Sequence, residues 1–174
     1  MSDRNKRDRI LDAAEARARR GGYNAFSFRE IADDVGVSSA AVHYHFATKA
    51  DLAEALTARY MDRTMERLGD PSALSGDEAI ARVESLFRDA LMRDDQMCLC
   101  GLFGSERDIL PAGVDAAVAR FFDAILDFLR VALRGGAGQD MPEAILAKLE
   151  GGLMLARSMR DTAIFDRATA TTTA

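Results

Sequence analysis

A short polar segment in the first third of the chain carries the side chains best able to form specific hydrogen bonds. Between residues 38 and 46 it holds both histidines of the chain, two adjacent serines and a tyrosine, and no long charged side chain. Serine and histidine can hydrogen-bond base edges or phosphates, alanine can contact a thymine methyl group, and a tyrosine hydroxyl can reach a phosphate oxygen. These residue types suit the major groove of DNA. The candidates are Ser38, Ser39, Ala40, His43, Tyr44 and His45.

Cationic and hydrogen-bonding residues flank this segment on both sides. Lys49 follows it at the expected start of another helix, where backbone N–H groups already favour a phosphate. Ser27 and Arg29 precede it and are placed to hold the DNA backbone from the other side. A basic cluster near the N-terminus indicates a cationic face for phosphates, although a solvated charged helix is the alternative interpretation. The cluster is Arg4, Lys6, Arg7, Arg9, Arg17, Arg19 and Arg20.

Other chemistry is poorly represented in the sequence. His43 and His45 are two residues apart, so on a helix they point to different sides, and no acidic or thiol partner has ligand spacing. There is no Gly-x-Ser-x-Gly motif, no phosphate-binding glycine-rich loop after a strand and no His-Glu-x-x-His motif. We therefore expect neither an enzyme nor a metal or other cofactor.

The two cysteines allow two interpretations. Cys98 and Cys100 would form a redox or electrophile sensor if Arg93 or Arg107 lowered the pKa of a thiol. Their apolar neighbours favour the other interpretation, in which they are small buried hydrophobic residues. Their spacing is too short for a useful structural disulfide, which fits a reducing cytoplasm.

The spacing around Gly36 predicts two short helices joined by a sharp turn. Ala32 is small where the helices cross, and Gly36 permits the turn because it has no side chain. Ile31 and Val35 supply the inner face of the first helix. Val42 anchors the second helix, so that its other side faces outward. This is the arrangement of a helix-turn-helix unit.

Capping signals and apolar periodicity extend the helical prediction to the whole chain. Ser27, Thr48 and Ser75 are each followed three residues later by an acidic residue, the signature of a capping box. A glycine cluster at 135–138 is expected to end one helix, and residues 169–174 are expected to form a frayed tail. The predicted helices are 3–20, 28–35, 39–46, 49–68, 79–93, 97–103, 114–133, 142–159 and about 162–167.

Length and charge favour a small DNA-reading module joined to a larger helical domain. The chain has 174 residues, of which 48% are hydrophobic and 29% charged, and a net charge of −5. The first 63 residues carry 11 basic against 10 acidic residues, whereas the remainder carries 12 against 18. The acidic remainder would restrict DNA contact to one end. No secretory signal or membrane-length apolar run is visible, so we expect a cytoplasmic protein with no membrane partner.

The second half offers candidates for a ligand pocket and for a dimer seam. A ligand cavity tends to be apolar, and flexible methionines suit one that opens and closes. The pocket candidates are Met61, Met65, Phe87, Leu91, Met97, Cys98, Leu102, Phe103, Phe121, Phe122, Ile125 and Met154. Small residues on the last long helix allow close approach of another helix, either from a second copy or within the chain. The seam candidates are Gly151, Gly152, Leu155, Ala156 and Met159.

The segment SFREIADDVGVSSAAVHYHFATKADL resembles the signature of TetR/AcrR-type bacterial regulators. The resemblance implies an all-α fold of about nine helices, with a helix-turn-helix domain at 1–48 and a ligand-binding and dimerisation domain at 49–174, linked by helix 49–68. It implies a homodimeric repressor that a small molecule releases from a palindromic double-stranded operator. The DNA-facing set that the resemblance implies is Ser27, Arg29, Ser39, Ala40, His43, Tyr44, His45 and Lys49. Arg17 and Ala18 stand where relatives often have large apolar residues, and His43 stands where tyrosine is common.

Two alternatives to this function remain. The first is a regulator that senses redox state or electrophiles through Cys98 and Cys100. The second is a helical protein-interaction module, which predicts no salt-sensitive binding to duplex DNA.

Overall fold

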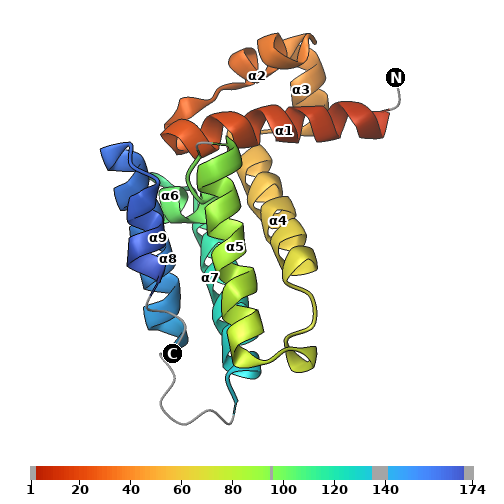
Figure 1. The fold of residues 1–174 in the computed structure, drawn as a ribbon. Helices are drawn as coiled ribbons and strands as arrows, with labels where there is room; N and C mark the ends of the chain where they lie inside the picture. The colour runs from red at the N-terminus through yellow and green to blue at the C-terminus, as the bar shows by residue number, and fades with distance from the viewer. Residues whose placement is uncertain (1–2, 95, 135–140, 171–174) are drawn as a thin grey trace. The chain divides into compact units, whose positions relative to one another are not determined.

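The chain is helical throughout the part that the computed structural model describes, which comprises residues 3–94, 96–134 and 141–170. Nine α-helices and three short 3₁₀ helices occur within these residues, and no strand does, which confirms the predicted all-α class (Figure 1). The α-helices are α1 (Asp3–Gly21), α2 (Phe28–Val35), α3 (Ser39–His45), α4 (Lys49–Leu68), α5 (Gly76–Asp94), α6 (Leu99–Ser105), α7 (Ala112–Ala132), α8 (Pro142–Met159) and α9 (Ala163–Thr169). The 3₁₀ helices are η1 (Tyr23–Ala25), η2 (Pro71–Ala73) and η3 (Arg107–Ile109).

The chain divides into two compact units. The first unit comprises Met1–Met61 and Leu99–Phe121, and the second comprises Asp62–Cys98 and Phe122–Ala174. Helices α4 and α7 contribute residues to both. None of the helices described combines the length and the apolar character that crossing a membrane requires.

Capping interactions begin the helices where the sequence predicts them. The Thr48 hydroxyl accepts from the Asp51 N–H at 3.1 Å, and the Asp51 carboxylate accepts from the Thr48 N–H at 2.9 Å. Ser75 and Glu78 form the same reciprocal pair at 3.3 and 2.8 Å before α5. A side-chain cap of this kind stabilises a helix by about 1 kcal/mol, because it satisfies N–H groups that the helix leaves unpaired.

The first unit packs α1 against α2 and α6. The predicted apolar face of α1, which includes Ile10, Leu11, Ala14 and Ala18, is fully buried. Arg17, on the polar side, bonds Asp34 of α2 at 2.5 and 3.0 Å and Glu30 at 3.1 Å. Arg17 therefore joins α1 to α2 through ion pairs across the helix surface.

The second unit is built on the close packing of α8 against α9. Gly152 is buried, and a Cβ added to it would lie 3.4 Å from the Phe165 ring and 3.5 Å from Ala168. Ala156, one turn further along α8, is 1% exposed. These two small residues are therefore covered within the chain, which is the intrachain alternative left open by the sequence.

Several helix ends differ from the predicted bounds. Helix α6 begins two residues later than expected and continues to Ser105, whose hydroxyl donates to the Leu102 carbonyl at 2.7 Å. Thr169, expected in a frayed tail, belongs to α9 and is 2% exposed, with its hydroxyl donating to the Phe165 carbonyl at 3.0 Å. The glycine cluster at 135–138 and residues 171–174 lie outside the described part of the chain.

Candidate nucleic-acid interface

Helices α2 and α3 form the predicted helix-turn-helix around Gly36. Gly36 is left-handed, with φ 72° and ψ 42°, a conformation that glycine adopts without steric cost. The N–H of the next residue, Val37, donates to the Ala32 carbonyl at 2.9 Å and closes the end of α2. Ser38 then caps α3, because its hydroxyl accepts from the Ala41 N–H at 3.2 Å. Local hydrogen bonds therefore define both ends of this turn.

The core beneath the turn decides which side of α3 faces outward. Ile31 and Val42 have no exposed surface, and Ala32 and Val35 are 3% and 5% exposed. Val42 is the one buried residue of α3. With its apolar side fixed in this way, α3 presents the remaining side chains to solvent.

The outward face of α3 carries most of the residues that the sequence singles out for DNA contact. Ser38, Ser39, Ala40, His43 and Tyr44 are all exposed, and Tyr44 is 77% exposed. The short side chains leave room for close approach to base edges, and Tyr44 is free to reach beyond the helix. The residues therefore share one polar face with no long charged side chain.

Two aromatic contacts orient the histidines of α3. The His43 ring meets the Phe28 ring edge-on, with centroids 4.5 Å apart, so α2 supports His43 from behind. His45 is half-buried, and its ring lies 5.2 Å from that of Tyr44. His43 is thus positioned at the surface. Among the described residues no group of three or more His, Cys, Asp or Glu side chains is arranged to hold a metal ion.

Ser27 and Arg29 lie exposed at the start of α2. The Ser27 hydroxyl accepts from the Glu30 N–H at 3.3 Å and donates to the Glu30 carboxylate at 2.8 Å. Ser27 therefore caps α2 as predicted. Arg29 carries the cationic group at this edge of the motif.

Lys49 is held by aromatic rings at the start of α4. Its ammonium lies 4.4 Å from the centre of the Tyr23 ring and 4.9 Å from that of Phe26. Partial burial lowers the pKa of Lys49, and attraction to Glu30 and Glu106 opposes that shift. These contacts fix the position of the cation, a feature that the sequence pattern does not indicate.

Part of the predicted basic cluster is engaged within the first unit. The Arg9 guanidinium donates to the Val35 carbonyl at 2.6 Å, at the end of α2. Arg19 is 8% exposed, lies 3.6 Å from the Glu15 carboxylate and covers the Tyr60 ring at 5.7 Å. With Arg17 paired to α2, at least three members of the cluster hold the unit together. Lys6, Arg7 and Arg20 are exposed or half-exposed.

Sequence reasoning missed a contact between the α1–α2 connection and Glu106, the residue that precedes η3. The Tyr23 N–H donates to the Glu106 carboxylate at 2.7 Å, although 83 residues separate the two. Gly22 precedes Tyr23 with φ 77° and ψ −164°, a region essentially restricted to glycine. A Cβ added to Gly22 would collide with the Glu106 carboxylate oxygens. The glycine pair at 21–22 is the only local signal, and it does not identify the partner.

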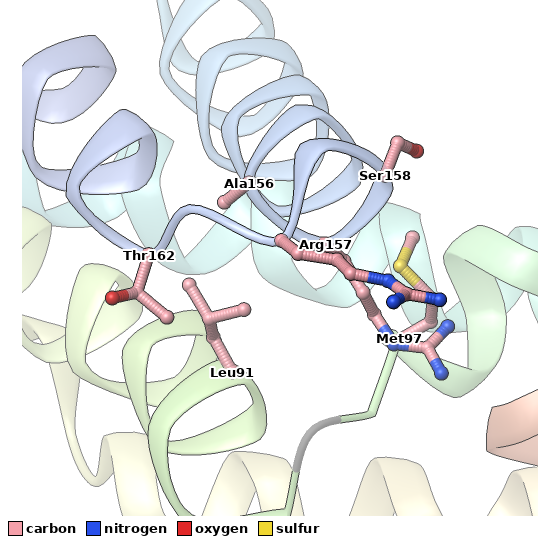
Figure 2. A pocket seen from close by; sticks show the side chains of 7 residues that line it. Leu91, Met97, Ala156, Arg157, Ser158 and Thr162 are labelled. Atoms are coloured by element: carbon pink, nitrogen blue, oxygen red, sulfur yellow. The ribbon is translucent and has the colours of Figure 1, made fainter.

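The predicted pocket residues are distributed over both units. Met61, Leu102, Phe103 and Phe121 belong to the first unit, and the others belong to the second. Of the whole set, Leu91 and Met97 line a hollow in the second unit (Figure 2). Met154 is 53% exposed on α8. Of the remaining candidates, the buried ones are Phe87, Cys98, Phe103, Phe121 and Ile125. The half-buried ones are Met61, Met65, Leu102 and Phe122.

Both cysteines are buried, with Cys98 3% exposed and Cys100 fully covered. Cys98 hydrogen-bonds the Glu150 carboxyl group, and burial raises the pKa of Glu150 to about 7. One oxygen of that carboxyl group is buried with no hydrogen-bond partner. The surroundings of Cys98 are therefore those of a shielded thiol.

This constellation defines a class of protein, the helix-turn-helix proteins, because a capped, outward-facing helix rests on a short supporting helix. The model of the TetR family of bacterial regulatory proteins matches residues 10–56, which span α2 and α3. A TetR transcriptional regulator from Legionella pneumophila is 32% identical and has a TM-score of 0.85, over 93% of this chain and 92% of that one. A TetR-family regulator from Agrobacterium tumefaciens is 26% identical, with a TM-score of 0.80 over 97% and 96%. The chain belongs to the TetR family.

Two curated repressors are similar over part of their length. The transcriptional repressor KstR of Rhodococcus jostii is 30% identical over 93 residues, which is 53% of this chain and 44% of the repressor. The nicotine-responsive repressor HdnoR of Paenarthrobacter nicotinovorans is 33% identical over 99 residues, which is 55% of this chain and 50% of that one. The match spans about half the length of these relatives.

Proposed function

We propose that this chain is a DNA-binding transcriptional regulator, most simply a repressor, that recognises a double-stranded operator through α3. The observation that carries the proposal is the division of α3 into a buried anchor, Val42, and an exposed polar face. The helix is capped and held by α2, so its face meets DNA already ordered and little conformational entropy is lost on binding. We place the helix-turn-helix domain at 1–48 and a ligand-binding and dimerisation domain at 49–174, with helix 49–68 linking them.

We assign different roles to the residues of this face. Ser39, Ala40 and His43 read base edges, whereas Tyr44 and Lys49 bind phosphates, together with Ser27, Arg29 and Ser38 at the helix starts. His45, which is half-buried, supports Tyr44.

Selection of bound sequences from random duplexes, followed by fluorescence anisotropy, tests this assignment. Tyr44→Phe is expected to weaken binding to every duplex and to reduce the salt dependence little, because it removes a neutral hydrogen bond. Lys49→Gln is expected to weaken binding to every duplex and to reduce the magnitude of the slope of log K against log salt concentration by about 1. Ser39→Ala and His43→Asn are expected to change which operator is preferred, by about 1–3 kcal/mol at one base pair.

The matched control is a substitution on the same unit but away from α3, such as Arg120→Gln on α7. It should leave both affinity and preference unchanged. Salt-insensitive binding, or no duplex selected at all, would support the alternative of a protein-interaction module.

We further propose that the regulator is a homodimer formed through the exposed face of α8. Met154, Leu155 and Met159 are 53%, 47% and 66% exposed there, an unusual density of large apolar side chains at a surface. Gly151 lies on the same face, and a Cβ added to it would meet nothing within 4 Å in this chain. Gly151, Leu155 and Met159 are thus the seam residues that remain available to a partner. A dimer of this kind would place two α3 helices in major grooves about 34–36 Å apart on a near-palindromic site.

Light scattering after size-exclusion chromatography tests the dimer. Gly151→Gln should stabilise α8 within a single chain, because glycine is the poorer helix former by roughly 0.5–1 kcal/mol. The larger side chain should at the same time block the close approach of a second helix. We expect it to produce a folded monomer. The control is Met92→Gln, which alters another exposed methionine, 60% exposed on α5, and should leave the mass unchanged.

We propose that a small-molecule effector shifts the dimer to a state with a different α3 separation and so releases the operator. The similarity to HdnoR, which is described as nicotine-responsive, supports a small molecule as the signal. Both cysteines are buried, so we place the signal in a ligand cavity rather than at a thiol. We place the protein in the cytoplasm, with its operator, and assign it no catalytic activity.

A further inference from the structure

Lys49, the cation assigned above to an operator phosphate, lies over a small aromatic cluster of the first unit. Its ammonium is 4.4 Å from the centre of the Tyr23 ring and 4.9 Å from that of the Phe26 ring. A lysine ammonium has three N–H donors, so contact with ring faces on one side leaves donors for a phosphate on another. A side chain that is held in place before binding loses less conformational entropy when it meets its partner. The two rings therefore prepare the cation for a phosphate.

The Tyr23 ring is in turn fixed from its edges. It meets the Phe103 ring of α6 edge-on with centroids 6.1 Å apart, and it meets the Phe26 ring in the same way at 6.1 Å. Phe103 is fully buried and Phe26 is 1% exposed. Because close-packed buried rings cannot shift without disturbing their neighbours, they hold the Tyr23 ring in one place. A residue of α6, far along the chain, thus helps to position the ring that contacts Lys49.

The backbone of Tyr23 is fixed by Glu106. The Tyr23 N–H donates to the Glu106 carboxylate at 2.7 Å, and this carboxylate occupies the space that a Cβ on Gly22 would fill. Glu106 is half-buried. A hydrogen bond to an ionised acceptor is stronger than one between neutral groups, so the bond holds the start of η1 firmly. Loss of the carboxylate would release the Tyr23 backbone, and with it the ring beneath Lys49.

Glu106 also acts on Lys49 through its charge, and this effect on DNA binding has the opposite sign. The carboxylate attracts the Lys49 ammonium. A negative charge in this neighbourhood also repels a DNA phosphate, so its removal by itself would strengthen binding to a duplex. If Glu106 serves mainly to position Lys49, its removal weakens binding instead. The direction of the change therefore separates the two effects.

We propose that Glu106 and Tyr23 are positioning residues for the phosphate contact of Lys49. The Glu106 carboxylate fixes the Tyr23 backbone, the Tyr23 and Phe26 rings fix the Lys49 ammonium, and the ordered ammonium binds a phosphate of duplex DNA. Glu106 acts through Tyr23 and not by contact with DNA. The phosphate contact rests on the function proposed above, whereas the placement of Lys49 by Glu106 and Tyr23 does not depend on it.

Nuclear magnetic resonance of the free protein, labelled with ¹³C at the lysine ε-carbons, tests the placement. The chain contains three lysines, Lys6, Lys49 and Lys148, so Lys49→Gln identifies the Lys49 signal by its disappearance. Protons above an aromatic ring face resonate upfield, so we expect the ε-methylene signal of Lys49 to lie upfield of the ordinary lysine position. Tyr23→Leu and Glu106→Ala should each return it toward that position. Tyr23→Phe and Glu106→Gln retain the ring and the hydrogen-bond acceptor, so they should leave it upfield.

Fluorescence anisotropy with a selected operator duplex tests the consequence for DNA binding. Glu106→Ala is expected to weaken binding about threefold, the scale of one exposed cation–π contact, although it removes a negative charge. Glu106→Gln should bind as tightly as the unmodified chain or more tightly, because it keeps the acceptor. In a Lys49→Gln background, Glu106→Ala should no longer weaken binding, since its effect passes through Lys49. Asp108→Ala, which removes an exposed carboxylate on η3, is the matched control for charge and should not weaken binding.

Tighter binding by Glu106→Ala would overturn the proposal, because charge would then outweigh positioning. Equal weakening in both Lys49 backgrounds would also contradict it, since Glu106 would then act through the fold as a whole, which circular dichroism of each variant checks. A Lys49 signal that ignores the loss of the Tyr23 ring or of the Glu106 carboxylate rules out the placement without any DNA. Failure of the proposed function is distinct. If the signals move as expected but Lys49→Gln changes neither affinity nor salt dependence, the placement is supported and the phosphate contact of Lys49 is contradicted.

Discussion

The contact between Gly22 and Glu106 predicts an unusual double-mutant cycle. In Gly22→Ala the new Cβ has two costs. The backbone conformation at φ 77° and ψ −164° is essentially restricted to glycine, so alanine there costs about 2 kcal/mol, within the 1–3 kcal/mol typical of such strain. The Cβ also collides with the Glu106 carboxylate and displaces it from the Tyr23 N–H. Loss of a hydrogen bond to a charged group costs about 1.5 kcal/mol at the lower end of the usual range, which suits a half-buried site.

The two single variants and the double variant should therefore not be additive. Gly22→Ala is expected to cost about 3.5 kcal/mol and Glu106→Ala about 1.5 kcal/mol. The double variant has already lost the carboxylate and suffers no collision, so it should cost about 3.5 kcal/mol as well. The interaction energy is then about 1.5 kcal/mol, well above the few tenths found for independent sites.

Urea denaturation followed by circular dichroism measures these free energies of unfolding. Glu106→Gln is the control for charge, because an amide oxygen can still accept from Tyr23 but more weakly, so it should cost less than Glu106→Ala. A double variant that loses about 5 kcal/mol, the sum of the singles, would refute the reasoning, because the carboxylate would then not occupy the space beside Gly22.

Three further outcomes follow from the same structure. Val42→Ala removes two fully buried methyl groups and should lower the free energy of unfolding by about 1.6 kcal/mol from transfer alone, before any cavity cost. Val37→Ala, at a half-buried position, should lower it clearly less in the same urea assay. Equal losses would show that Val42 does not anchor α3. Arg17→Ala should lower the free energy of unfolding by less than about 1 kcal/mol at low salt, and by less still in 0.5 M salt, because the ion pairs of Arg17 are partly exposed. A loss of several kcal/mol would contradict this expectation. The pKa of Glu150, raised to about 7 by burial, means that the folded state holds a proton that the unfolded state releases near its ordinary value of 4.5. The contribution of Glu150 to the free energy of unfolding is therefore fully present below pH 4.5 and is lost as the pH rises through 7, a loss on the order of 3 kcal/mol. Glu150→Gln should abolish this pH dependence when urea titrations at pH 5 and pH 8 are compared. An unchanged dependence would assign it to another group.

The local signals of this sequence were sufficient to predict several helix starts and the turn at Gly36. The capping pairs at Thr48 and Ser75, the small residue Ala32 and the glycine at position 36 act through neighbours within four residues, so they predict helix starts and the turn without knowledge of the rest of the chain. The exposed face of α3 follows from the same period, because burial of Val42 determines which side chains face outward.

Helix period alone could not assign a partner to each buried face. The small residues of α8 predicted close approach of another helix, and the structure supplies α9 for Gly152, whereas Gly151, one residue away, faces away from the chain's own atoms. Two adjacent residues on a helix lie about 100° apart, so a single stripe of small residues can divide between an internal and an external surface. The pocket candidates divide in the same way, with Met154 exposed and Leu91 and Met97 at a hollow.

The amino-acid sequence by itself determined where α2, α3 and α4 begin, which side of each is apolar, and that α3 carries a polar face suited to DNA. Those properties depend on backbone hydrogen bonds and on side chains three or four residues apart, which the order of residues specifies directly. Only the tertiary structure decided the partners over long distances, such as Glu106 at the Tyr23 N–H and Lys49 on two aromatic rings. Such contacts depend on how helices pack in three dimensions, because residues 23 to 83 positions apart meet only after the chain has folded.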